Sequence, residues 1–184
     1  MTAKKQLLTE TALQLFYARG IHAIGINEIL AQSGVAKKTL YHHFASKDEL
    51  LLAALQLRHE RFISWLNESL QQATTGDAAV EKLFMALSSW FNSEEEKLGY
   101  FRGCFFINTS AEFSDAESAV FQRCQLHKQV VRETIGRYLQ CDEQRLNKVC
   151  LLMEGAIVTA QVSGGADAAC ALAVKILSND KGQG

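Results

Sequence analysis

The segment GINEILAQSGVAKKTLYHHFASKDEL, residues 25–50, carries two short helical patterns on either side of a glycine turn. The first predicts a helix over residues 26–33 and the second a helix over residues 37–44, because apolar side chains recur with the spacing of one helical face. Those apolar residues are Ile26, Ile29, Leu30, Leu40 and Phe44. Two short helices joined by a turn around Gly34 are the sequence form of a helix-turn-helix.

A longer helix is predicted before this segment, over residues 3–19, where apolar residues recur at steps of three and four. Gly20 ends it, because glycine readily adopts the left-handed conformation of a helix cap. After the segment, Ser46 and Glu49 have the spacing of a capping box, in which the serine oxygen accepts from a first-turn amide and Glu49 reaches back to the serine amide. The helix that follows is predicted to reach about residue 72.

Helical spacing continues through the rest of the chain, in which we find no strand pattern, internal repeat or low-complexity tract. Asp77 and Asp142 are predicted to cap two of these helices, and residues 114–117 have the spacing of a second capping box. Residues 103–113 predict a short buried helix. The last helix is predicted over residues 167–177, after a tight connection that contains two glycines.

The predicted fold class is all-α, with about nine helices. A three-helix helix-turn-helix head, residues 1–47, stands on a larger helical body, residues 48–184. The chain contains no proline, which favours helices because no backbone donor is lost inside a turn. The boundary between head and body is expected to lie inside a continuous helix, so that the helix can carry motion from one to the other.

Charge is unevenly distributed along the chain. The formal net charge is −1, but residues 1–47 contain six basic and two acidic residues, which gives this part +4. A basic end suits a protein that meets phosphates with one face only. An ordinary uneven surface is the alternative that charge alone leaves open. Hydrophobic residues make up 48% and charged residues 21% of the chain, so disorder is expected only over residues 179–184.

Cysteine usage indicates a reduced compartment. The chain has five cysteines, an odd number without C-x-x-C spacing, so we expect free and mostly buried thiols. They are Cys104, Cys124, Cys141, Cys150 and Cys170. No signal peptide opens the sequence, and no apolar run approaches the ~20 residues of a membrane helix. We therefore predict a cytoplasmic protein without a membrane partner.

The stretch of residues 20–50 resembles the DNA-binding head of the tetracycline-repressor (TetR) family. The matching residues are Gly20, Ile26, Ile29, Ala31, Gly34-Val35, Thr39-Leu40-Tyr41, His43-Phe44 and Ser46-Lys47-Asp48-Glu49-Leu50. The resemblance implies a regulator that binds double-stranded operator DNA and is released by a small molecule, with repression as the usual mode. One departure is Ile24-Gly25, where the family often has a hydroxyl that binds phosphate; Asn27 is the candidate substitute.

The predicted recognition helix is crowded with hydrogen-bond donors. The candidate DNA-binding residues are Asn27, Lys37, Lys38, Thr39, Tyr41, His42, His43 and Lys47. Residues at the start of such a helix reach base edges, where lysine addresses guanine acceptors and the Thr39 methyl can touch a thymine methyl. The resemblance implies phosphate contacts for Tyr41, His43 and Lys47. The alternative is a solvated basic helix on a protein that does not bind DNA.

The resemblance also implies a homodimer through the last two helices of each subunit. Small residues that allow close helix approach are Gly155, Ala156, Ala160, Ala166, Ala169 and Ala173, and apolar contact comes from Met153, Ile157, Leu172 and Ile176. Packing inside one chain is the alternative for these residues.

In the TetR family the middle helices often enclose a ligand. The candidate ligand-binding residues are Trp90, Phe91, Phe101, Cys104, Phe105, Asn108, Phe121, His127 and Met153. Aromatic residues at this spacing more often belong to a hydrophobic core, which is the alternative for each of them. Residues 102–112 are the most suggestive, because Asn108, Thr109 and Glu112 lie in an apolar setting where polar groups need partners.

Other functions remain as alternatives. Cys104 could be a redox or electrophile switch if its thiol were accessible and its pKa lowered, and a buried inert thiol is the competing interpretation. Cys124 and His127 have the spacing of a metal pair, but two ligands do not make a site, so no metal or cofactor is predicted. None of the usual enzyme motifs occurs, so we predict no enzyme. A helical protein-interaction adaptor is the alternative from another class.

Overall fold

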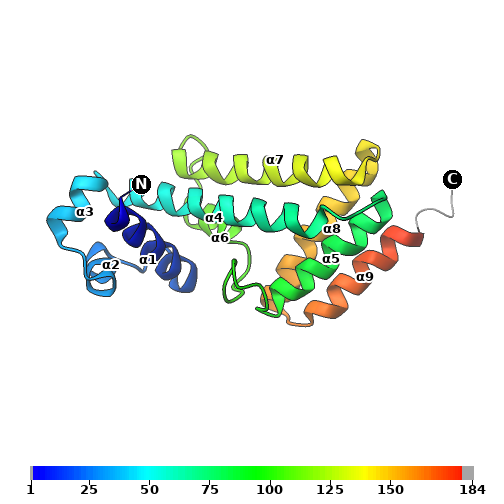
Figure 1. Ribbon diagram of the computed structural model, residues 1–184, viewed down its shortest axis with the longest axis horizontal. Coiled ribbons are helices and arrows are strands. Elements are labelled where there is room, and N and C mark those ends of the chain that lie inside the picture. The colour runs from blue at the N-terminus through cyan, green and yellow to red at the C-terminus, as the bar shows by residue number, and fades with distance from the viewer. Residues whose placement is uncertain (1, 180–184) are drawn as a thin grey trace. The chain divides into compact units, whose positions relative to one another are not determined.

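A computed structural model describes residues 2–179, which form nine α-helices and no β-strand. The helices are α1 (Ala3–Arg19), α2 (Ile26–Ser33), α3 (Lys37–His43), α4 (Lys47–Leu70), α5 (Gly76–Phe91), α6 (Phe105–Glu112), α7 (Ala119–Leu139), α8 (Glu143–Val162) and α9 (Ala166–Asn179) (Figure 1). The all-α prediction is confirmed. Of the predicted disordered end, Asn179 is helical and residues 180–184 lie outside the described part.

The chain packs as two compact units. Unit 1 consists of Met1–Glu60 and Cys104–His127, and unit 2 of Arg61–Gly103 and Lys128–Gly184. In unit 1, α1 packs against α2 and α3, and in unit 2, α9 packs against α5 and α8. Helices α4 and α7 contribute residues to both units. The functional division after residue 47 stays a prediction.

The three helices at the start of unit 1 have the predicted bounds almost to the residue. Ile29, Leu40 and Phe44 are buried, so both short helices turn their apolar stripes inward. Gly34 follows α2 with φ 65° and ψ 12°, the left-handed conformation that lets the chain reverse within a few residues. Gly20 ends α1 as predicted, but its φ of 88° and ψ of 154° are not those of a left-handed cap.

The start of α4 carries a variant of the predicted capping box. The Ser46 hydroxyl accepts a hydrogen bond from the Glu49 amide at 3.1 Å, as predicted. The Glu49 carboxylate, however, accepts from the amide of Ala45 at 2.6 Å and not from that of Ser46. The helix ends at Leu70, two residues before the expected end. Two reciprocal hydrogen bonds therefore close the first turn of α4, and the bond that Glu49 accepts comes from the residue before the one predicted.

The cap of α5 was predicted at the wrong residue. Thr75 is the N-cap, and its hydroxyl accepts from the Ala78 amide at 3.1 Å. Asp77 lies inside the first turn, where its carboxylate accepts from Arg145 of α8 at 2.5 Å. Threonine is also a preferred N-cap residue, and the ion pair to α8 gives the aspartate another role.

The second capping box, predicted over residues 114–117, is also wrong. Helix α7 begins at Ala119, after Ser118, whose hydroxyl accepts from the Phe121 amide at 3.2 Å. The preceding residues close a turn of their own, because Asp115 accepts from the amides of Glu117 and Ser118. By contrast, the predicted cap of α8 is confirmed, since Asp142 accepts from the Arg145 amide at 2.8 Å.

Within residues 2–179, none of the helices combines the length and the apolar character that crossing a bilayer requires.

Candidate DNA-binding surface and ligand site

Helix α3 presents donors on its outer face. Lys37, Lys38 and His42 are exposed, and the Tyr41 side chain is 48% exposed. The same helix is anchored by Leu40, which is fully buried. Since one buried residue per turn fixes such a short helix, the remaining side chains are free to meet a ligand from outside. Four of the predicted donors of this helix are therefore accessible from outside, namely Lys37, Lys38, Tyr41 and His42.

The other predicted DNA-binding residues differ in accessibility. Asn27 of α2 is exposed, whereas Thr39 and His43 are half-buried. The Lys47 ammonium donates to the Ile21 carbonyl at 2.6 Å and lies 5.7 Å from the Phe16 ring centre. Lys47 thus joins the start of α4 to the loop after α1. Its predicted phosphate contact stays a prediction, and it would compete with this internal bond.

Glu112, at the end of α6, holds the same loop from the other side. Its Oε1 accepts from the Ile21 amide at 2.8 Å, and its Oε2 accepts from the His22 amide at 2.7 Å. The His22 ring lies near this carboxylate, with Nδ1 3.1 Å from Oε2, and stacks on Phe113 with ring centres 5.0 Å apart. The carboxylate therefore satisfies two backbone donors of the α1–α2 loop.

Sequence reasoning identified Glu112 only as a polar group in need of a partner. The partner lies about 90 residues away in the chain and is backbone, so no side-chain motif could reveal it. The signal available in the sequence was an acidic residue at the end of an otherwise uncharged short helix, where a carboxylate is unfavourable for the helix dipole.

The predicted ligand-binding residues are divided between the two units. Cys104, Phe105, Asn108, Phe121 and His127 belong to unit 1, and Trp90, Phe91, Phe101 and Met153 belong to unit 2. Most are buried, while Asn108 and Phe121 are half-buried. Burial of this kind suits either a hydrophobic core or the wall of a ligand site. The ligand-binding role of these residues stays a prediction.

In unit 1 the best-defined of these residues is His127. It is 1% exposed, its ring stacks on Phe106 with centres 3.5 Å apart, and its Nδ1 lies 3.0 Å from Nδ1 of His59. The pKa of His59 is lowered, first by burial of its ring and then by the positive charge of Arg123, against an opposing effect of Glu60. Helices α4, α6 and α7 thus bring two imidazoles and a guanidinium together.

In unit 2 the aromatic residues pack on one another. Trp90 meets Phe101 edge-on with ring centres 5.0 Å apart, and Phe62 at 5.4 Å. Phe91 is also in contact with Phe101, at 4.9 Å. Edge-to-face packing of this kind stabilises a core, and here it joins α4, α5 and the segment before α6.

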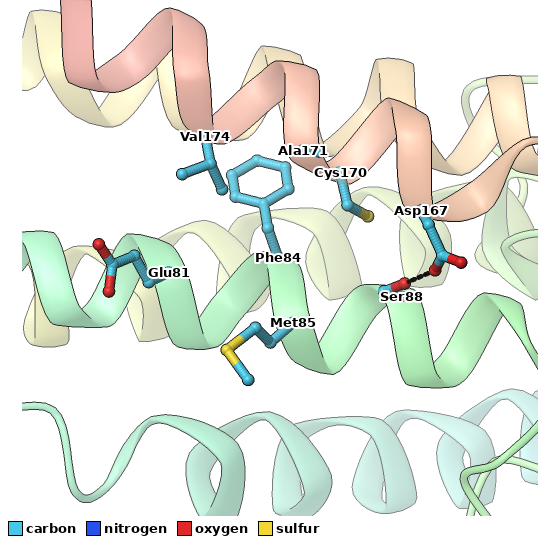
Figure 2. Close-up of a pocket in the computed structure, with 8 residues that line it drawn as sticks. All are labelled: Glu81, Phe84, Met85, Ser88, Asp167, Cys170, Ala171 and Val174. Carbon is cyan, nitrogen blue, oxygen red and sulfur yellow. Dashed lines mark hydrogen bonds between the residues drawn. The ribbon is translucent and has the colours of Figure 1, made fainter.

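A groove of about 450 Å³ lies elsewhere in unit 2, between α5 and α9. Figure 2 shows its residues, which are Glu81, Phe84, Met85, Ser88, Asp167, Cys170, Ala171 and Val174. Asp167 accepts from the Ser88 hydroxyl and from Asn92 at one end of it. None of the predicted ligand-binding residues lines this groove, which the sequence did not suggest.

Exposed apolar side chains mark α8 and α9. They are Leu151, Val158 and Val162 on α8 and Leu172 and Ile176 on α9. On α8 they follow steps of four and seven residues with the exposed Gly155 between them, so they form one stripe. Met153 and Ile157, which were predicted to contact a partner subunit, are instead buried because α8 packs against α5 and α9 within the chain. For these two the prediction is wrong, as it is for the buried Ala156 and Ala173.

The five cysteines are free thiols, as predicted. Cys104, Cys124 and Cys170 are buried, and burial raises the pKa of the Cys170 thiol to about 11. Cys104 is only 4% exposed, which disfavours the access that a redox switch needs. Among the described residues no three histidine, cysteine or acidic side chains are grouped so that they could hold a metal ion.

Comparison with known proteins agrees with the fold and with the helix-turn-helix. Residues 8–54 match the model of the family described as bacterial regulatory proteins, tetR family. Of the solved structures, a TetR-family transcriptional regulator from Streptomyces coelicolor superposes with a TM-score of 0.81 at 23% identity, covering 96% of this chain and 93% of the other. The reduced form of NemR from E. coli superposes with a TM-score of 0.80 at 22% identity, covering 97% and 96%. At these identities the structures show the fold.

The curated relatives with similar sequences are transcriptional regulators. LmrA of Bacillus subtilis, an HTH-type transcriptional regulator, is 24% identical over 162 residues, which are 88% of this chain and 83% of LmrA. The activator FasR of Mycolicibacterium smegmatis is 37% identical over 90 residues, 48% of this chain and 40% of FasR. The repressor NemR of Escherichia coli is 28% identical over 111 residues, 60% of this chain and 54% of NemR. The chain thus spans about half the length of the last two relatives.

The matched residues 8–54 contain most of α1, all of α2 and α3 with their buried anchors and exposed donors, and the start of α4, and the helical remainder follows the fold of solved regulators. The helix-turn-helix part of this chain therefore matches the tetR family of bacterial regulatory proteins, and the described helices have the fold of solved TetR-family regulators.

Proposed function

We propose that the chain is a ligand-responsive repressor, which binds operator DNA as a homodimer and leaves it when a small molecule binds. The observation that carries the proposal is the outer face of α3, where Lys37, Lys38 and Tyr41 are exposed opposite the buried Leu40. The net charge of +4 on residues 1–47 supports it, because phosphates attract this part of an otherwise acidic chain.

We assign the base contacts to the start of α3. Lys37 and Lys38 supply donors for guanine O6 and N7, and Thr39 supplies a methyl group for thymine. Phosphate contacts are assigned to Tyr41, His43 and Lys47, with Asn27 in place of the hydroxyl that many TetR proteins have before α2, and His42 beside them. The exposure of most of these side chains supports the assignment.

The homodimer interface is proposed on α8 and α9. The exposed stripe on α8 contains Leu151 and Val162, 75% and 77% exposed, which is unfavourable in water unless another surface covers it. A second copy of the same two helices would form a four-helix bundle across a two-fold axis. Such a dimer carries two recognition helices, and these match the half-sites of a palindromic operator.

Repression follows most directly from such a complex, because occupying an operator excludes other proteins without any further contact. We place the protein in the cytoplasm, where bacterial DNA is. A ligand releases DNA only if it binds the conformation that does not fit DNA more tightly. We propose that this ligand binds near α6, because Glu112 at the end of α6 holds the α1–α2 loop within the same unit.

The proposal is tested by selecting bound DNA from a random pool and measuring affinity for the selected sequence at several salt concentrations. Lys37→Ala and Lys38→Ala should each weaken binding, and a lysine that contacts phosphate should also lower the salt slope by about one unit. Lys82→Ala, which removes the same charge from α5 of unit 2, serves as the matched control. Affinity and slope that stay unchanged in both α3 variants would contradict the recognition-helix assignment.

A further inference from the structure

Helix α7 carries an arginine whose hydrogen-bonding edge meets no acceptor. The Nε and Nη2 atoms of Arg123 are both shielded from solvent, and neither has a hydrogen-bond partner among the described residues. These two N–H groups lie on the same edge of the planar guanidinium and point the same way. A carboxylate accepts from such an edge with both of its oxygens. Charged donors that are shielded from water and lack acceptors are destabilising. A bound anion that accepts from this edge of the guanidinium would therefore be stabilised.

One side of α7 next to Arg123 is buried, and the other side, with Ala119 and Leu126, is exposed. Val120 lies one turn before it and His127 one turn after it, and both side chains have almost no exposed surface. The His127 ring in turn stacks on Phe106 of α6. An anion that reaches Arg123 therefore lies within one helical turn of a buried apolar and a buried aromatic side chain. This setting favours an anion with an apolar body over a bare inorganic ion.

Helix α6 adds a second shielded donor in the same unit. Thr109 lies one turn after Phe106, it is fully buried, and its hydroxyl has no hydrogen-bond partner within the described part of the chain. A threonine inside a helix commonly donates to the carbonyl four residues earlier, and this bond is not formed here. Helices α6 and α7 therefore each carry an unsatisfied donor one helical turn from a member of the Phe106–His127 stack.

The positive charge of Arg123 is only partly offset in this region, because the opposing effect of Glu60 on the His59 pKa is smaller than that of Arg123. The charge of Arg123 reaches His59 on α4, where it adds to the effect of burial in lowering the pKa of that imidazole. By contrast, Arg132 further along α7 pairs with Glu143. Arg132 thus has a carboxylate partner within the chain, whereas the Nε and Nη2 groups of Arg123 have no hydrogen-bond partner among the described residues.

We propose that Arg123 and Thr109 form the binding site of a monocarboxylate with an apolar body, which the Nε and Nη2 groups of Arg123 hold side-on. The carboxylate completes the hydrogen bonds of the guanidinium edge, and its apolar body contacts the aromatic surface next to Phe106. This inference rests on the proposed function in one respect only, namely that the bound molecule is the regulatory ligand. Binding itself can be measured without DNA.

The test uses calorimetry and thermal unfolding of the full chain with sodium benzoate and sodium octanoate. Benzamide and octanamide, the matched neutral amides, and inorganic phosphate are the comparison probes. We expect the carboxylates to bind and to raise the unfolding temperature, and the amides to do neither. Arg123→Gln should lose about tenfold or more in carboxylate affinity, as expected for a hydrogen bond to a charged group. Arg132→Gln, the matched control on the same helix, should keep the affinity.

Arg123→Met gives a second readout that does not depend on the probe. Removing shielded donors that lack acceptors should leave the free protein as stable as the parent or more stable, while abolishing the response to carboxylates. The unfolding temperature of the free protein therefore distinguishes the two possible roles of Arg123. Loss of an arginine that only stabilises the fold would lower this temperature, whereas loss of an arginine that binds a ligand would not.

Three results would overturn the proposal. The first is that neither carboxylate binds, and the second is that phosphate binds as well as the carboxylates, which would indicate a site for inorganic anions only. The third is that the Arg123 variants bind the carboxylates with the same affinity as the parent protein. A different result would bear on the proposed function alone. If carboxylates bind through Arg123 but leave the protein on its operator, the site stands and ligand-controlled release at this site is wrong.

Discussion

Replacing Glu112 with alanine should loosen the loop between α1 and α2. The change removes the acceptor of two backbone hydrogen bonds, at 2.8 Å from Ile21 and 2.7 Å from His22. A hydrogen bond to a charged group contributes about 1.5–3 kcal/mol, and the carboxylate is 25% exposed, so we take the lower value for each. The expected loss is about 3 kcal/mol of unfolding free energy, or roughly 6–12 °C in the unfolding temperature of a chain of this size.

Hydrogen exchange locates the effect. In the parent protein the amides of Ile21 and His22 should exchange slowly, and in Glu112→Ala they should exchange at the rate of an open loop, whereas the Leu40 amide within α3 should change little. Glu117→Ala, at an exposed residue in the turn before α7, is the control for losing a negative charge. Unfolding temperature and exchange that match this control would refute the idea that α6 holds the loop.

Two further outcomes follow from the packing and the charges. Val158→Asp should convert the dimer to a monomer in sedimentation at micromolar concentration, because a charge then lies in the proposed apolar contact. Glu133→Asp, at an exposed residue of α7, should leave the dimer intact. If Val158→Asp still forms a dimer, the interface lies elsewhere. The lowered pKa of folded His59 means that the unfolded chain binds more protons below about pH 6.5, so stability should fall as the pH drops through this window. His59→Gln should weaken the dependence of stability on pH, whereas His42→Gln, at an exposed site, should leave it unchanged. If calorimetry gives the same profile of unfolding temperature against pH for both variants, His59 is not the source of the dependence.

The head was the most predictable part, for physical reasons. In α2 and α3 the buried stripe, the glycine turn and the capping serine all lie within 25 residues and point to the same structure. The caps of α5 and α7 were misplaced, because several capping residues stand close together there and only tertiary contacts choose among them. Asp77 is a good cap in isolation, but its pairing with Arg145 depends on where α8 passes.

The candidate site was predictable in its chemistry and less so in its partners. Donors at exposed positions of α3 follow from the helical pattern alone. The role of Glu112 depends on a loop far away in sequence, and that of Arg123 on the acceptor it lacks, so neither leaves a local signal. Aromatic residues gave the weakest guidance, because Trp90 packs on Phe101 with the same residue types that a ligand site would use.

The apolar stripe on α8 makes the lifetime of this protein in a cell depend on its concentration. If a second copy covers Leu151 and Val162, folding and pairing are one equilibrium, and the unfolding temperature rises with protein concentration by mass action. A cell that makes few copies would then contain a fraction of monomers, whose exposed apolar surface and lower stability make them accessible to proteases. Expression level would thus set how long each regulator survives as well as how many operators it fills.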